Sequence, residues 1–344
     1  MRGMDLALRL DDPDARYAAV RLASDLPLSD EERSFARVNG GWVLELEPPQ
    51  VQRLEYQLEL VGPDGRIAYA PDPGNPHRAP GAFGEKSVLL APGYRPPAWL
   101  EAPAVEGRFD ELSVRGRGLG ATVAMRVWSP ADADADTPLR LLLVHDGPEY
   151  DALASLTRFS AAKIAAGELP PHRVALLAPG DRDHWYSASK VYGRVLTHDL
   201  IPALRESFPT VDALVGMGAS LGALAMLHAQ RGFPRTFGAL FLQSGSFFMP
   251  RYDAHERRFV RYARIVRFVR ATLADGRYAL PIPVALTAGT AEENLHNNRA
   301  MAAALAAQGY EATLAEVPDL HNYTGWRDAF DPHLTALLQR AWTR

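Results

Sequence analysis

Residues 211–231 place a short apolar run, a tight turn and a helix in direct succession. The run 213–217 is small and apolar, which suits a strand buried in a parallel sheet, and 223–230 consists of strong helix formers. Between them, 218–222 has the sequence Gly-Ala-Ser-Leu-Gly, a G-x-S-x-G pattern whose glycines allow close backbone packing. This context predicts a nucleophile elbow with Ser220 at its tip. The alternative is a turn whose serine only caps the helix.

The length and composition indicate two globular domains, because 344 residues are too many for one ordinary hydrophobic core. A net charge of −4 gives no basic field of the kind that nucleic-acid binding needs. The absence of cysteine excludes disulfides, a thiol nucleophile and cysteine-ligated metal. Acidic residues interrupt the N-terminus before any signal-peptide core, and no apolar run is long enough to span a membrane. We therefore expect a cytoplasmic protein that binds neither nucleic acid nor membranes.

The order of expected elements predicts the domain boundaries. Residues 1–95 contain short alternating strands with close turns, which indicates a small antiparallel β-sandwich. Residues 96–106 are a proline-rich linker. In 107–344 a hairpin precedes alternating strands and helices, which indicates an α/β domain with a mostly parallel sheet and helices on both faces. The longer helices are expected at 151–166, 192–207, 255–273, 295–308 and 326–341.

A serine hydroxyl needs a base, and the base needs an acid that orients it. In this architecture the chain order is serine, acid, histidine. Glu292 and Glu293 follow one expected strand, and His321 follows the last one, so these side chains should reach the same sheet edge as Ser220. Each residue also has a non-catalytic alternative. Either glutamate could be a first-turn acid that faces a helix dipole, and His321 could be an ordinary surface-loop histidine. No histidine has a metal-ligand spacing, and we expect no metal or other cofactor.

The stretch 218–248 resembles the putative esterase family of α/β-hydrolases, in particular the enterochelin (ferric enterobactin) esterase group. The N-terminal stretches 56–58 and 72–76 are similar to the immunoglobulin-like domain that precedes these esterases, so the resemblance covers nearly the whole chain. Besides the elbow, the positions that carry the resemblance are Asp146, Gly147, Leu200, Ile201, Pro202, Pro234, Phe237, Gly238, Gln243, Ser244, Gly245, Ser246, Gly289, Thr290, His321 and Trp326.

The resemblance implies a Ser220–His321–Glu292 triad. Glu292 is chosen over Glu293 because the acid lies three residues beyond the glycine in similar feruloyl-type esterases, and here that glycine is Gly289. The backbone N–H of Leu221 would be one oxyanion donor. The second would come from the loop at Gly147, where the sequence departs from the family, because Pro148 has no N–H. Gly147 or Glu149 must then serve as the donor. This sequence also departs from the family at Ala223, which stands where the family has a second glycine after the serine.

Two further groups of residues are candidates for substrate contact. Arg182, Trp185 and Tyr186 follow an expected strand and should line the same opening, unless they form a packed surface loop. The expected helix 255–273 carries six arginines, which form either a solvated basic face or a site for an anionic ligand. Membrane-surface binding is a third alternative that the net negative charge disfavours.

These observations predict a serine ester hydrolase that works through an acyl-enzyme intermediate on a small-molecule ester. The family resemblance suggests a siderophore trilactone as substrate, although the fold supports many chemistries. The alternatives are a carbohydrate-ester (acetyl or feruloyl) esterase and a catalytically silent binding protein of the same fold. The sequence leaves the oligomeric state open.

Overall fold

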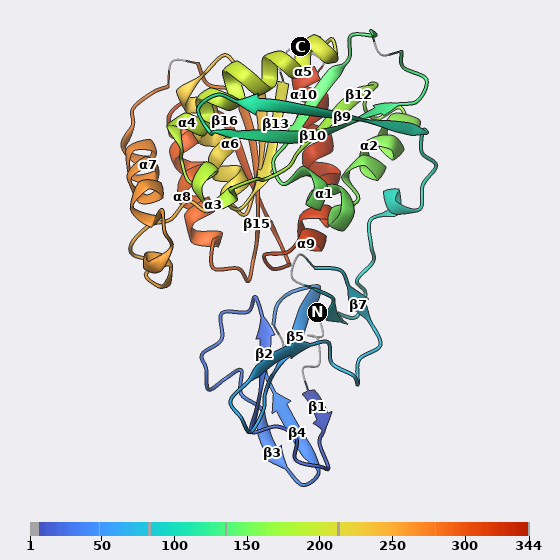
Figure 1. Ribbon diagram of the computed structural model, residues 1–344, viewed down its shortest axis with the longest axis vertical. Helices are drawn as coiled ribbons and strands as arrows, with labels where there is room; N and C mark the ends of the chain where they lie inside the picture. The colour runs from blue at the N-terminus through green and yellow to red at the C-terminus, as the bar shows by residue number, and fades with distance from the viewer. Residues whose placement is uncertain are drawn as a thin grey trace. The chain divides into compact units, whose positions relative to one another are not determined.

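The computed structural model describes residues 7–47, 49–81, 84–134, 136–211, 214–278 and 280–342. The chain divides into two compact units (Figure 1). The β unit consists of Met1–Arg95, Gly289–Glu293 and Val317–Gly325, and the α/β unit contains the rest of the chain. The extreme N-terminus and Ala213, the first residue expected in the elbow strand, lie outside the described residues.

Two antiparallel sheets form the β unit. One has the strand order β1-β4-β3, and the other has the order β2-β5-β8-β7 with β6 paired to β5. Buried and exposed side chains alternate along β1 and β2, and apolar residues from both sheets meet in one core. The strands are β1 (Ala7–Asp11), β2 (Ala19–Ser24), β3 (Ala36–Val38), β4 (Gly41–Glu45), β5 (Arg53–Val61), β6 (Ile67–Ala70), β7 (Arg78–Ala79) and β8 (Lys86–Leu90).

Two late segments of the chain, Gly289–Glu293 and Val317–Gly325, group with the β unit. The backbone N–H of Gln52 donates to the carbonyl of Pro318 at 2.7 Å. Leu320 is buried in a small apolar cluster of this unit. These segments carry the residues expected to activate the serine, so the β unit takes part in placing them.

A buried arginine also connects one of these segments to β5. The Arg53 side chain is 4% exposed. Its Nη2 lies 2.5 Å from a Glu55 oxygen, and its Nη1 lies 3.8 Å from an Asp319 oxygen. Burial opposes the charge on Arg53, but the two carboxylates outweigh it and raise the pKa of the guanidinium. Removing this charge would take the arginine away from two buried carboxylates, of which Glu55 also has Lys86 at 3.7 Å.

The α/β unit contains an eight-stranded sheet in the order β16-β15-β14-β13-β11-β12-β10-β9. Parallel pairing links β12, β11, β13, β14 and β15, and the β9–β10 hairpin joins β12 antiparallel. Every residue of β12, β13 and β15 is buried, as expected for strands covered on both faces. The strands are β9 (Gly107–Gly116), β10 (Ala121–Pro130), β11 (Arg140–Val144), β12 (His172–Leu177), β13 (Leu214–Ala219), β14 (Phe237–Gln243), β15 (Pro283–Gly289) and β16 (Glu311–Val317).

Helices flank this sheet on both sides (Figure 1), as the sequence predicts for an α/β domain. The α-helices are α1 (Gly147–Ala154), α2 (Leu156–Ala165), α3 (Arg182–Trp185), α4 (Lys190–Val195), α5 (Ile201–Ser207), α6 (Leu221–Gly232), α7 (Tyr262–Ala274), α8 (Leu295–Ala307), α9 (Tyr323–Asp328) and α10 (Thr335–Trp342). Shorter helical turns are η1 (Ala98–Leu100), η2 (Leu196–Leu200), η3 (His255–Arg258) and η4 (Phe330–Leu334).

Three expected helices are interrupted. The helix expected at 151–166 is two helices, α1 and α2, which meet at Ser155 with φ 54°. The last helix is broken ahead of Pro332, because the residue before a proline avoids the helical conformation. The arginine-rich helix is separated into η3 and α7 by Phe259, whose ψ is 130°. Periodicity alone does not reveal such breaks.

The segment expected as a linker is anchored to the α/β unit at Trp99. This side chain is 5% exposed, and its ring lies 5.4 Å from that of Phe159 in an edge-on arrangement. The segment is therefore not a free spacer along its whole length.

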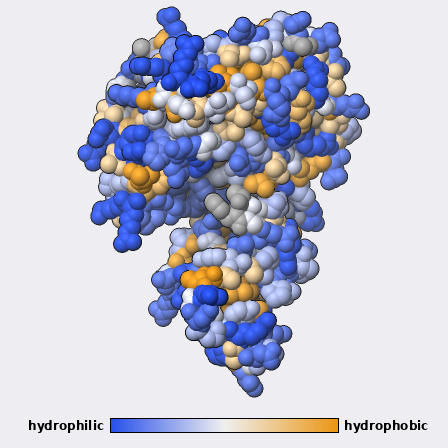
Figure 2. Space-filling view, in the orientation of Figure 1, coloured by the Kyte–Doolittle hydropathy of each residue, from blue (hydrophilic) through white to orange (hydrophobic). Residues whose placement is uncertain are grey.

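The face drawn in Figure 2 is mostly hydrophilic, with hydrophobic residues in small separate areas. Among the described residues, no helix has the length and apolar character needed to cross a membrane.

We predict that Arg53→Met destabilises the β unit by about 3–5 kcal/mol, because it removes the buried cation that pairs with Glu55 and Asp319. The matched control is Arg66→Met, which removes an arginine of the same unit whose side chain is 91% exposed beside Asp64. Urea unfolding should show an earlier transition for the first variant and no measurable change for the second. Equal midpoints would show that the buried pair contributes nothing.

Candidate active site

Ser220 lies on a strained turn between β13 and α6. Its φ of 54° and ψ of −124° fall outside the regions that non-glycine residues usually occupy. A Cβ at Gly218 would lie 2.6 Å from the backbone carbon of Gly222, so only glycine allows the strand and the helix to approach this closely. The hydroxyl makes no capping hydrogen bond to α6 in the described structure, and its Oγ lies 3.0 Å from Ser246 Oγ. The alternative of a helix-capping serine is therefore wrong.

The loop after β14 holds Ser246 against the elbow. The Ser246 backbone N–H donates to the Ser220 carbonyl at 3.1 Å. Ser244, with φ 47°, donates its N–H to the carbonyl of Thr287 at 2.7 Å and accepts from Trp326 Nε1 at 2.9 Å. Ser246 is a site residue that the sequence pattern alone did not predict; its signal was a Ser-Gly-Ser triplet directly after a buried strand.

The amides of Leu221 and Gly147 are the first N–H groups of α6 and α1, and first-turn amides have no acceptor within their own helix. Within the described part of the chain, neither amide has another acceptor. A Cβ at position 147 would lie 2.3 Å from Leu176 Cα, so this position requires glycine. The Glu149 amide, the alternative donor, lies in the same first turn of α1. The choice of Gly147 over Glu149 as the second donor stays a prediction.

Asp146, directly before Gly147, adopts the left-handed conformation with φ 50° and ψ 37°. Its side chain is 4% exposed and is held by Arg182 from α3. Arg182 Nε lies 2.9 and 3.1 Å from the two carboxylate oxygens, and Nη2 lies 2.9 Å from Oδ2. This bidentate pair fixes both the turn and the arginine.

His145 links the elbow to the core, a role that the sequence pattern did not predict. Its Nδ1 lies 3.0 Å from the Gly222 carbonyl, and its Nε2 lies 2.8 Å from the Tyr192 hydroxyl. Burial lowers the pKa of His145 to about 4, so the ring is neutral near pH 7. Because a carbonyl only accepts, Nδ1 carries the hydrogen and Nε2 accepts from Tyr192. The available signal was a histidine at the carboxyl end of an apolar strand.

The three residues expected to line the substrate opening have different roles in the structure. Tyr186 is fully buried and stacks on His145, with ring centroids 4.4 Å apart. Trp185 is 8% exposed and stacks on Tyr192 at 5.9 Å. Both rings pack in the core, and their contact with substrate stays a prediction. Arg182 is partly exposed, but its guanidinium is bound to Asp146.

Of the six arginines in the expected basic helix, Arg264 makes hydrogen bonds that anchor the helix in the described part of the chain. The Arg264 guanidinium donates to the carbonyls of Ser187 and His184, which anchors α7 to the segment after β12. Burial and the nearby Arg261 lower the pKa of Arg264. This arginine is therefore a packing contact rather than part of a solvated face.

Glu292 and His321 form a hydrogen bond in the β unit. Glu292 Oε2 lies 2.7 Å from His321 Nδ1, and its Oε1 accepts from the Gly289 N–H at 2.5 Å. Burial lowers the pKa of His321, but Glu292, with smaller contributions from Asp25 and Glu293, raises it above the ordinary 6.5. The pair therefore stabilises the fold most below the unfolded pKa, and this contribution is lost as pH rises through the raised value.

Glu292 is buried, whereas Glu293 is exposed, so the hydrogen bond distinguishes the two glutamates. The nucleophile candidate belongs to the α/β unit, and the paired acid and histidine belong to the β unit. The structure brings Glu292 and His321 together; their association with Ser220 stays a prediction.

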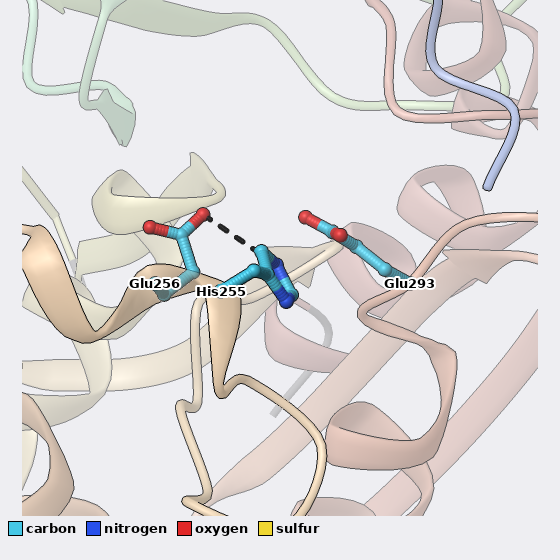
Figure 3. A group of neighbouring side chains, drawn as sticks. All are labelled: His255, Glu256 and Glu293. Carbon is cyan, nitrogen blue, oxygen red and sulfur yellow. Dashed lines mark ion pairs between the residues drawn. The ribbon is translucent and has the colours of Figure 1, made fainter. Parts of the chain in front are cut away.

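Figure 3 draws His255, Glu256 and Glu293, which carry ligand atoms of the kind that bind metals. His255 Nε2 lies 3.9 Å from a Glu256 oxygen, and both residues are in the α/β unit, whereas Glu293 is in the β unit. The His255–Glu256 pair alone offers too few ligands for a structural metal site.

We expect Glu292→Gln to lower the pKa of His321, because it removes the charge that offsets burial. Glu293→Gln is the matched control, since it makes the same change at an exposed neighbour with a smaller effect on the histidine. Both pKa values can be measured by NMR titration of protein labelled with ¹³C at histidine. A larger shift in the control would transfer the pairing role to Glu293.

The family model described as "Putative esterase" matches residues 117–337. Over 215 residues the chain is 27% identical to the iron(III) enterobactin esterase of Dickeya dadantii, and over 201 residues it is 28% identical to that of Escherichia coli O6:H1. These alignments cover 59% and 54% of this chain and 49% and 48% of the relatives. The chain thus matches about half the length of these curated relatives.

Solved structures share the fold. The enterobactin esterase of Shigella flexneri in the presence of 2,3-di-hydroxy-N-benzoyl-serine has a TM-score of 0.75 at 19% identity, covering 97% of this chain and 93% of that one. A ferulic acid esterase has a TM-score of 0.58 at 14% identity, covering 68% of this chain and 99% of that one. This likeness shows an α/β-hydrolase fold. Since the family model also spans more than half of the 344 residues, the chain belongs to the putative esterase family.

Proposed function

We propose that this protein hydrolyses carboxylic esters, with Ser220 as nucleophile, His321 as base and Glu292 as the acid that orients the base. The observation that carries the proposal is the strained backbone of Ser220 at the end of β13, since such a conformation is costly and concentrates at functional sites. The paired Glu292 and His321 add a base with an orienting acid. Family membership supports the same reaction class.

The sheet topology supports the association of Ser220 with the other two residues. Strands β13, β14 and β15 are parallel neighbours, so their carboxyl ends share one edge. Ser220 directly follows β13, and Glu292 follows β15 by three residues. Ligands and catalytic groups in such sheets collect at this edge.

In the proposed cycle, Ser220 Oγ attacks the ester carbonyl carbon while its proton passes to His321 Nε2. The tetrahedral oxyanion accepts hydrogen bonds from the Leu221 and Gly147 amides. The carbon–oxygen bond to the leaving alcohol then breaks, and His321 returns the proton to that alcohol. Water, deprotonated by His321, hydrolyses the acyl-enzyme and restores Ser220. Glu292 holds Nδ1–H, so that Nε2 is the basic nitrogen throughout.

We propose a catecholate siderophore lactone as the substrate, because the matched relatives are named iron(III) enterobactin esterases. The bound iron would be part of that substrate. A second candidate is a feruloyl or acetyl ester of a carbohydrate, which the similarity to a ferulic acid esterase fold favours. A hydrolysis screen of ferric and iron-free catecholate lactones, feruloyl sugars and acetyl sugars separates the two. Preference for the sugar esters would overturn the siderophore assignment.

We predict that Ser220→Ala and His321→Ala each lower kcat about 10³-fold or more, and that the double variant loses little beyond either, because the groups act as a unit. The exposed Ser113→Ala and His198→Ala serve as controls and should leave kcat unchanged. A fluorophosphonate probe should label the wild type and not Ser220→Ala. An unlabelled wild type would instead support a silent binding protein.

A further inference from the structure

The Asp146–Gly147 turn places a buried carboxylate directly before the candidate second oxyanion donor. The Asp146 side chain is 4% exposed. Its Oδ2 lies 3.3 Å from where a Cβ at Gly222 would be, which puts the carboxylate at the first turn of the elbow helix α6. That helix end is the region whose positive potential would stabilise a developing oxyanion. An unpaired carboxylate there would oppose the charge that forms in the transition state.

Arg182 is the group that offsets this carboxylate. Its Nε and Nη2 make three contacts of 2.9 to 3.1 Å with the two oxygens of Asp146. The guanidinium also lies 5.7 Å from the ring centroid of Tyr186, which is fully buried. The arginine is therefore held in place by packing as well as by charge.

The same contacts fix the backbone of the turn. Asp146 is left-handed at φ 50°, a conformation that costs energy for a non-glycine residue and that aspartate tolerates better than most. Its N–H donates to the Tyr186 hydroxyl at 3.4 Å, and its carbonyl accepts from the Tyr150 N–H at 2.9 Å. With the backbone and the carboxylate both held, the amide of Gly147 has a set position.

We propose that Arg182 is a positioning residue for the oxyanion hole: it fixes the Asp146–Gly147 turn and neutralises the Asp146 carboxylate. This inference rests on the proposed ester hydrolysis. It replaces the expected role of Arg182 as a substrate contact, and it explains how a turn followed by Pro148 still presents one donor. Arg182 acts through Asp146 and does not touch the reacting atoms.

The test compares Arg182→Met, Arg182→Lys, Asp146→Asn and the double variant Arg182→Met/Asp146→Asn on p-nitrophenyl acetate. This ester is neutral, so an arginine that only recruits anionic substrates would not affect it. We expect Arg182→Met to lower kcat about 10²-fold, the cost typical of losing one oxyanion donor, with KM nearly unchanged. Arg182→Lys keeps the charge without the bidentate geometry and should fall between this variant and the wild type.

The double variant provides the decisive measurement. The double variant removes the carboxylate together with the arginine that compensates it. Its kcat should therefore be at least about tenfold higher than that of Arg182→Met. The inhibition constant of a trifluoromethyl ketone, whose adduct places an oxyanion in the hole, should rise in Arg182→Met and fall again in the double variant. Circular dichroism checks that each variant is folded.

Three outcomes would overturn the inference. An unchanged kcat in Arg182→Met, or a loss confined to KM, would remove the positioning role while leaving the esterase assignment intact. A double variant no faster than Arg182→Met would show that charge compensation is not what the arginine supplies. A wild type that neither hydrolyses the ester nor reacts with a fluorophosphonate would overturn the proposed function, and this inference with it.

Discussion

The close approach of β13 and α6 at Ser220 is the constraint on which the rest of the site depends. Gly218 leaves no side chain between the strand and the helix, Gly222 leaves none against His145 and Asp146, and Ser220 between them has a strained backbone. Strain of this kind persists only where the surroundings hold it. Here the loop after β14 and His145 hold the elbow through hydrogen bonds to the Ser220 and Gly222 carbonyls. The elbow is thus supported by segments far from it in the sequence.

His145 and His321 show how the surroundings give one residue type two different roles. Among the described residues no carboxylate is hydrogen-bonded to the His145 ring, so burial lowers its pKa and it serves as a neutral bridge between Gly222 and Tyr192. The His321 side chain is 28% exposed, and the Glu292 carboxylate outweighs its partial desolvation and raises its pKa. A base poised near neutral pH requires such a balance between desolvation and a partner charge. The sequence shows only that both residues follow strands.

The β unit is not only a separate N-terminal domain, because it also includes the two late segments that carry the proposed acid and base. It includes the segments that carry Glu292 and His321, and the buried Arg53 binds Asp319 two residues before the histidine. Removing that charge would take the nearby cation away from a buried carboxylate that also accepts from the Leu320 N–H and Asn322 Nδ2. Stability of the N-terminal strands and the position of the proposed base are therefore linked through one ion pair.

The sequence by itself determined the elbow, the alternation of strands and helices, and the order of Ser220, Glu292 and His321, because these follow from local pattern and from the topology of parallel sheets. It could not show that Tyr186 is core or that Arg182 is bound to Asp146, since an aromatic or a charge in a loop has the same sequence signal whether it faces solvent or a partner. The breaks in three helices and the grouping of late segments with the β unit were also decided only in three dimensions. Contacts between distant residues set burial, pairing and pKa, and no local pattern encodes them.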